Sequence, residues 1–194
     1  MKKTLKISLI AIFILIGATW SFKKFNLNPS HSTGDVIDSL NNVSVYYNGG
    51  VSNVEGRNTL NGYNLGLKYQ CVEFVKRYYY QFYNHKMPDT YGNAKDFFNS
   101  SILDGQLNTQ RSLIQYSNPS KWKPKIGDLI VMSGTLFNKY GHVAIVSNVE
   151  DDELEIIQQN PGPFSSSRET FGIVETNGLW TIKNDRIMGW LRMK

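Results

Sequence analysis

The sequence predicts an α+β domain in which helices near the N-terminus pack on an antiparallel sheet built from the C-terminal half. Apolar residues after Cys71 recur at a period near 3.6, which is typical of an amphipathic helix. From Trp122 onward, five runs of strand-forming residues alternate with turn residues, and three of these runs are rich in Val and Ile. Helices followed by consecutive strands indicate segregated layers rather than an alternating α/β fold.

Residues 1–25 have the plan of a secretory signal peptide or a short membrane anchor. Three lysines lie among the first six residues, an uncharged run of 16 residues follows over 7–22, and two more lysines close it. That run is shorter than the ~20 residues that cross a bilayer comfortably. We therefore expect an exported protein, in the periplasm, the cell envelope or the medium. Retention at the inner membrane through residues 7–22 is the alternative to cleavage.

The rest of the chain divides into a linker and one domain. Residues 26–49 are rich in Asn, Ser and Gly, which is typical of a linker. Residues 50–194 are long enough for one domain with a real core. Within it, residues 50–70 have turn residues every few positions and predict loops with short extended pieces. Residues 93–102 predict a second short helix with two phenylalanines on its core side.

Charge and cysteine content exclude several classes of protein. The net charge is +5, but the leader and its flank contribute five lysines, so the domain itself is close to neutral and has no nucleic-acid footprint. A single cysteine excludes an intrachain disulfide framework. One Cys and three scattered His give no metal-ligand spacing, so we expect neither a metal nor another cofactor. We expect a monomer.

The one cysteine, Cys71, lies where the predicted amphipathic helix begins. Amide N–H groups are unpaired in the first turn of a helix, and the helix dipole favours an anion there. A thiolate at such a position can have its pKa lowered from about 8.5 into a range of roughly 3.5 to 7.5. The alternative is an inert, buried cysteine. A lone thiol in an exported protein is a liability unless it is buried or used, which favours a functional role.

A base for this thiol is available at His142, the first residue of the predicted strand 142–149. Strand alternation places Gln158 and Asn160 on one face of the following strand, and a hairpin would bring them beside His142. A nucleophile on a helix, a histidine on a strand and an orienting amide on the next strand form the layout of a papain-like cysteine hydrolase. Either Gln158 or Asn160 could orient the imidazole.

Two further features flank the thiol. Gln70 could donate to an oxyanion together with the Cys71 backbone amide, or it could cap the helix. Glu73 and Arg77 are spaced four apart on the helix, which predicts a helix-surface ion pair in preference to a substrate-recognition pair.

The segments "YQCVEFVKRYY", "GDLIV", "GHVAIVSNV", "IIQQN" and "IMGWLR", in this order, resemble the CHAP domain (cysteine, histidine-dependent amidohydrolase/peptidase) over residues 50–192. The "QCVEF" and "GWLR" forms are most similar to the amidase half of the bifunctional glutathionylspermidine synthetase/amidase family. The resemblance implies a papain-like fold, Cys71 as nucleophile and His142 as general base. It also implies amide substrates, most often in peptidoglycan.

One position departs from the family pattern. The family usually has Glu where this chain has Gln158, and Asn160 is kept. A neutral amide can still orient the imidazole, but it gives up electrostatic support of about 1–2 kcal/mol for the imidazolium. We therefore expect a slower or re-tuned enzyme in preference to an inactive one.

The predicted function is an exported cysteine hydrolase that cleaves peptidoglycan or peptide amide bonds, as an amidase or endopeptidase. One alternative, which follows from the resemblance, is an amidase that acts on glutathionylspermidine-like conjugates. The other, suggested by Gln158, is a non-catalytic module that binds the cell wall.

Overall fold

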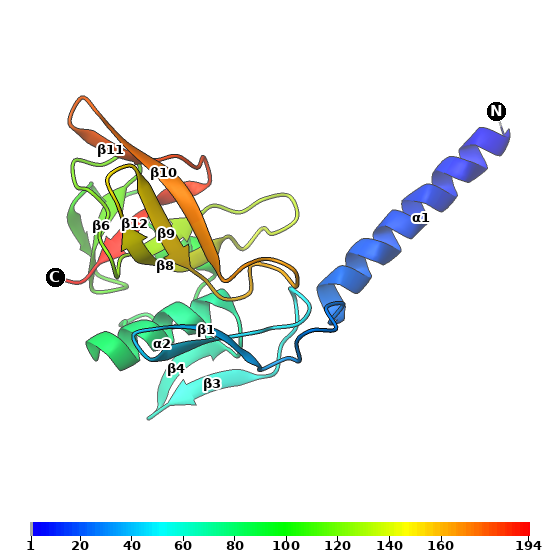
Figure 1. Ribbon diagram of the computed structural model, residues 1–194, viewed down its shortest axis with the longest axis horizontal. Coiled ribbons are helices and arrows are strands. Elements are labelled where there is room, and N and C mark those ends of the chain that lie inside the picture. Colours follow the sequence, from blue (N-terminus) through cyan, green and yellow to red (C-terminus); the bar gives the residue numbers. More distant parts are fainter. Residues whose placement is uncertain (1) are drawn as a thin grey trace.

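The computed structural model describes residues 2–194, and its first helix stands apart from the rest (Figure 1). Helix α1 (Lys2–Lys24) projects from the folded domain, and its apolar side chains between Ile7 and Ile16 are largely exposed. It covers most of residues 1–25, the segment expected to be a signal peptide or membrane anchor and not a helix of the domain. Over the described part of the chain, no helix is both long enough and apolar enough to traverse a bilayer.

An eight-stranded antiparallel sheet forms the body of the domain. Its strand order is β11-β10-β9-β8-β7-β12-β6-β5, and every neighbouring pair is antiparallel. The predicted α+β class is confirmed. The strands are β5 (Gln106–Asn108), β6 (Leu113–Ser117), β7 (Leu129–Met132), β8 (His142–Val149), β9 (Glu153–Ile157), β10 (Arg168–Thr176), β11 (Leu179–Ile182) and β12 (Ile187–Arg192).

The five predicted strands are β7, β8, β9, β11 and β12, whereas β5, β6 and β10 were not predicted. The predicted second short helix is a single 3-10 turn, η1 (Ala94–Phe97), and Phe97 is buried as expected.

Two small hairpins precede the helix that carries the cysteine. They are β1 (Val36–Leu40) with β2 (Val43–Tyr46), and β3 (Arg57–Leu60) with β4 (Tyr63–Leu67). Residues 26–49 were expected to form a linker that runs into a loop or short strand, and the linker part is wrong for the first hairpin, because Val43 and Val45 are buried in the main core. Alternate residues of β2 face inward, so a short polar segment supplies an apolar face. The folded domain thus begins before residue 50.

Helix α2 (Cys71–Tyr83) packs against β2 and β4 of the two hairpins and against β8 of the large sheet. Phe74, Val75, Tyr78 and Tyr79 are fully buried, and they pack in one cluster with residues of β2, β7 and β8. Each such side chain contributes roughly 1.5–3 kcal/mol through burial. This packing fixes the start of α2 against the start of β8. A second apolar cluster, which includes Trp190, also contributes to the core.

Candidate active site

Cys71 is the first residue of α2, as the sequence predicted. Gln70 precedes it as the helix N-cap with extended backbone, but the Gln70 side chain makes no capping bond. The residue as a whole is half-buried, and the backbone amides of Val143, Val72 and Cys71 itself interact with its thiol. Burial has the larger effect and raises the pKa of the Cys71 thiol, while these amides lower it only in part. The expected lowering of this pKa by the helix start is therefore wrong for the free site.

His142 begins β8 and is buried. Burial lowers the pKa of its imidazole to about 4, the Gln158 side chain raises the pKa, and the charge of Arg186 lowers it. Among residues 2–194, the Nε2 atom of His142 has no hydrogen-bond partner, and no hydrogen bond joins its ring to the Cys71 thiol. The two groups are nevertheless close in the fold, because the thiol lies against the backbone amide of Val143. Both groups are neutral in the free site at neutral pH.

Gly141 makes the start of β8 possible. Its φ is +78°, and a Cβ there would lie 2.5 Å from the carbonyl oxygen of Met132 and 2.8 Å from the Cβ of Lys95. Any side chain would therefore push β8 away from β7 and η1, and His142 would move with it.

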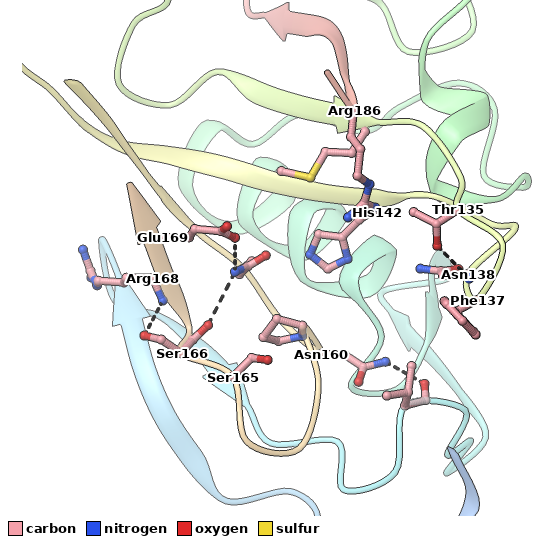
Figure 2. A pocket seen from close by; sticks show the side chains of 14 residues that line it. Thr135, Phe137, Asn138, His142, Asn160, Ser165, Ser166, Arg168, Glu169 and Arg186 are labelled. Carbon is pink, nitrogen blue, oxygen red and sulfur yellow. Dashed lines mark hydrogen bonds between the residues drawn. The ribbon is translucent and has the colours of Figure 1, made fainter. Parts of the chain in front are cut away.

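Gln158 is the amide that the structure brings to His142. It is buried, and its Nε2 atom donates to Glu169 Oε2 at 3.3 Å and to the carbonyl oxygen of Ser166 at 3.4 Å, drawn as dashed lines in Figure 2. Because both partners take amide hydrogens, the amide oxygen is left to face the ring. An accepting oxygen favours the protonated imidazole, which agrees with the upward effect of Gln158 on the His142 pKa.

Gln159 points the other way and joins α2 to the sheet. Its amide nitrogen donates to Gln70 O at 3.0 Å and to Glu73 Oε2 at 2.9 Å, and its oxygen accepts from the Tyr46 backbone amide at 2.8 Å. Glu73 also pairs with Arg77 at 2.6 Å. The side chains of Arg77 and Glu73 are only 6% and 2% exposed, so the expected surface ion pair is wrong: it is buried. Sequence reasoning missed Gln159.

Asn160 secures the segment in front of Cys71. Its Nδ2 atom donates to Val51 O and to Gln70 Oε1, both at 2.8 Å. Gln70 Nε2 in turn donates to Asn53 O at 2.8 Å and to Val51 O at 3.4 Å. The free site therefore does not join Asn160 to His142. The Gln70 amide hydrogens are directed at backbone carbonyls, so in this state they do not point toward a substrate oxyanion.

A pocket of about 460 Å³ opens beside His142 (Figure 2). Three charged residues at this pocket were not found by sequence reasoning: Arg168 and Glu169 from β10, and Arg186 from the turn before β12. None of them lies in a recognisable motif, so the sequence held no signal for them. The lining residues are Val51, Met132, Thr135, Phe137, Asn138, His142, Gln158, Asn160, Pro161, Ser165, Ser166, Arg168, Glu169 and Arg186.

Known proteins are similar to this chain over part of their length. The bifunctional glutathionylspermidine synthetase/amidase of Escherichia coli (strain K12) is 31% identical over 139 residues, which are 66% of this chain and 22% of that protein. Endolysin PlyTW of Staphylococcus phage Twort (strain DSM 17442 / HER 48) is 38% identical over 80 residues, which are 41% of this chain and 15% of that protein. This chain thus spans less than a quarter of either relative.

A solved structure described as "The crystal structure of Ly7917 with the hydrolyzing product of MDP" matches with a TM-score of 0.41 at 17% identity, over 65% of this chain and 54% of that chain. The family model described as CHAP domain matches residues 61–160, which is just over half of the chain. That match includes the cysteine and histidine segments and the amide run "QQN". It confirms the resemblance seen in the sequence, and the chain belongs to the CHAP domain family.

Proposed function

We propose that this protein is a cysteine hydrolase that cleaves amide bonds, with Cys71 as nucleophile, His142 as general base and Gln158 as the group that orients the imidazole. One observation carries the proposal. The Cys71 thiol lies at the start of α2 against the backbone amide of Val143, and the preceding residue is a buried His142 whose ring is held by Gln158. The names of the relatives support it, since one is a synthetase/amidase and another an endolysin.

The reaction begins from a neutral thiol and a neutral imidazole. His142 takes the thiol proton as the sulfur attacks the substrate carbonyl carbon, and the backbone amides at the start of α2 stabilise the oxyanion. The imidazolium then donates its proton to the leaving amine, and a thioester remains on Cys71. A water molecule, deprotonated by His142, attacks this thioester and releases the acid product. The free site does not align the thiol and imidazole, and such bonds often tighten only in the substrate complex.

The proposed substrate is an amide bond of peptidoglycan, as an amidase or endopeptidase would cleave it, and the endolysin relative supports this choice. The test is a peptidoglycan digest read by mass spectrometry, with residues 26–194 and the matched Cys71→Ala variant. New amine and carboxyl ends from the first protein alone support the proposal. Identical digests from both would contradict it.

The synthetase/amidase relative favours a second candidate, an amidase of glutathionylspermidine-like conjugates. Turnover of glutathionylspermidine with an unchanged peptidoglycan digest would assign this function instead. Binding of insoluble peptidoglycan without turnover of either substrate would assign the non-catalytic binding module.

We also propose that the protein is exported through residues 1–25. The support is an exposed apolar helix that projects from the domain and is flanked by lysines. Fractionation of expressing cells, followed by N-terminal sequencing of the mature protein, tests this. Recovery of the full chain in the cytosol alone would contradict it.

A further inference from the structure

Arg186 lines the pocket beside His142, and Glu169 lines the same pocket (Figure 2). The Arg186 Nη2 atom donates to Ser133 O at 3.3 Å, while its Nε atom is buried without a hydrogen-bond partner. In the part of the chain that the structure describes, no carboxylate pairs with Arg186. Arg168, which lines the same pocket, is by contrast held by Asp38 at 2.9 Å and by a second carboxylate at 2.8 Å.

This arrangement is unfavourable in the free protein. A guanidinium has five donors, and a buried donor without an acceptor carries a desolvation penalty. Arg186 also works against the proposed base, because its charge lowers the pKa of His142. The single hydrogen bond from Arg186 to the carbonyl oxygen of Ser133 is long, so it contributes little to the stability of the fold. A ligand that supplies an anion to Arg186 would explain why a cation is kept at this cost beside the proposed base.

We propose that Arg186 binds a carboxylate of the substrate close to the amide bond that is cut, so that the preferred substrates are peptides with a free carboxylate beside the scissile bond. A carboxylate fits this group because it can accept two parallel N–H bonds from a guanidinium. The inference rests on the proposed function for the cleavage step, but not for the binding itself.

Binding of an acidic substrate would also change the base. The bound carboxylate offsets the charge of Arg186, so the effect of that charge on the His142 pKa is removed while the substrate is present. The His142 imidazole would then be a stronger base when the bound substrate carries the carboxylate than when it carries a carboxamide in its place.

The test uses the full chain with Cys71→Ala and two synthetic peptides that differ in one group. Both are acetyl-L-alanyl-γ-D-glutamyl-L-lysine amide, one with a free α-carboxylate on the glutamyl residue and the other with an α-carboxamide. Calorimetry should show tighter binding of the carboxylate peptide by about tenfold or more. Arg186→Gln should abolish this difference, and Arg186→Lys should keep part of it. The matched control is Lys183→Gln, which removes an exposed charge outside the pocket lining and should keep all of it.

Equal affinity for the two peptides, including no measurable binding of either, would overturn the proposal. So would an equal loss for both peptides in Arg186→Gln, because that result indicates a structural role. Turnover by the chain with Cys71 intact is scored separately. A carboxylate preference in binding without cleavage of either peptide would overturn the hydrolase function and leave the Arg186 site standing.

Discussion

The contact between Gln158 and Glu169 allows a test in which two side chains exchange their roles. In the native site an amide at 158 faces a carboxylate at 169, with 3.3 Å between Nε2 and Oε2. Gln158→Glu alone would place two carboxylates at about this separation. Their repulsion is about 5 kcal/mol at an effective dielectric constant of ~20 and about 1 kcal/mol in water. Glu169 is exposed, so the lower part of this range applies.

We therefore expect Gln158→Glu to lower kcat/KM about 5- to 30-fold, since the repelled carboxylate takes up a proton or turns away from His142. Glu169→Gln should cost less, because an amide oxygen at 169 can still accept from Gln158. The double variant Gln158→Glu, Glu169→Gln restores one amide and one carboxylate in exchanged positions. Its kcat/KM should return to at least the native value.

The assay is kcat/KM for the four proteins on one cleavable peptide, analysed as a double-mutant cycle. We expect a coupling free energy of about 1–3 kcal/mol. Additivity within about 0.5 kcal/mol would refute the reasoning, because Glu169 would then not act through Gln158. The melting temperatures of the four proteins serve as the control, since a loss caused only by unfolding would appear there.

Three further predictions concern the site and its supports. The pKa of His142 is lowered to about 4 and that of Cys71 is raised, so kcat/KM should stay level from about pH 5 to pH 8. It should fall only as the pH drops through about 4 and the imidazole becomes protonated. A pH–rate profile in which kcat/KM already falls on acidification at a pH above 6 would contradict this. Gly141→Ala should destabilise the fold by about 2 kcal/mol or more, measured by urea unfolding, since its Cβ would meet a backbone carbonyl oxygen 2.5 Å away at a φ of +78°. Arg77→Met should cost about 3–5 kcal/mol in the same measurement, because it leaves Glu73 buried without its partner; a change below about 1 kcal/mol would show that the pair is not structural.

The sequence predicted the elements whose apolar pattern is strong. Helix α2 and strand β8 present continuous apolar faces, so period alone located them. Strand β10 was not predicted because its buried apolar residues are only Phe171 and Ile173, while both ends of the strand consist of charged residues and threonines. Strand β6 contains a buried Gln115, which bonds to Asn99 and Asn108 instead of facing solvent. Polar residues satisfied by the fold therefore resemble loop residues in the sequence.

The site was predictable in its parts and not in its electrostatics. Strand alternation placed both Gln158 and Asn160 beside His142, and the structure brings only Gln158 to it. It gave no information on Glu169, which lies on β10, or on Arg186, which lies in the turn before β12. The position of Cys71 revealed the nearby amides, whereas the burial that dominates its pKa depends on the packed tertiary structure. Long-range packing thus decided the protonation states.

The three amides Gln158, Gln159 and Asn160 diverge from one short segment of backbone, and this has a mechanical consequence. Gln159 fastens the end of β9 to the first turn of α2, and β9 is paired with β8, which carries the base. The base and the nucleophile therefore cannot hinge apart without breaking these hydrogen bonds. Adaptation to a bulky substrate must then come from the chain around residues 135–138 and 161–166, which borders the pocket without bearing the nucleophile or the base. Grafting these two loops between CHAP domains should alter substrate choice while the reactive pair keeps its spacing.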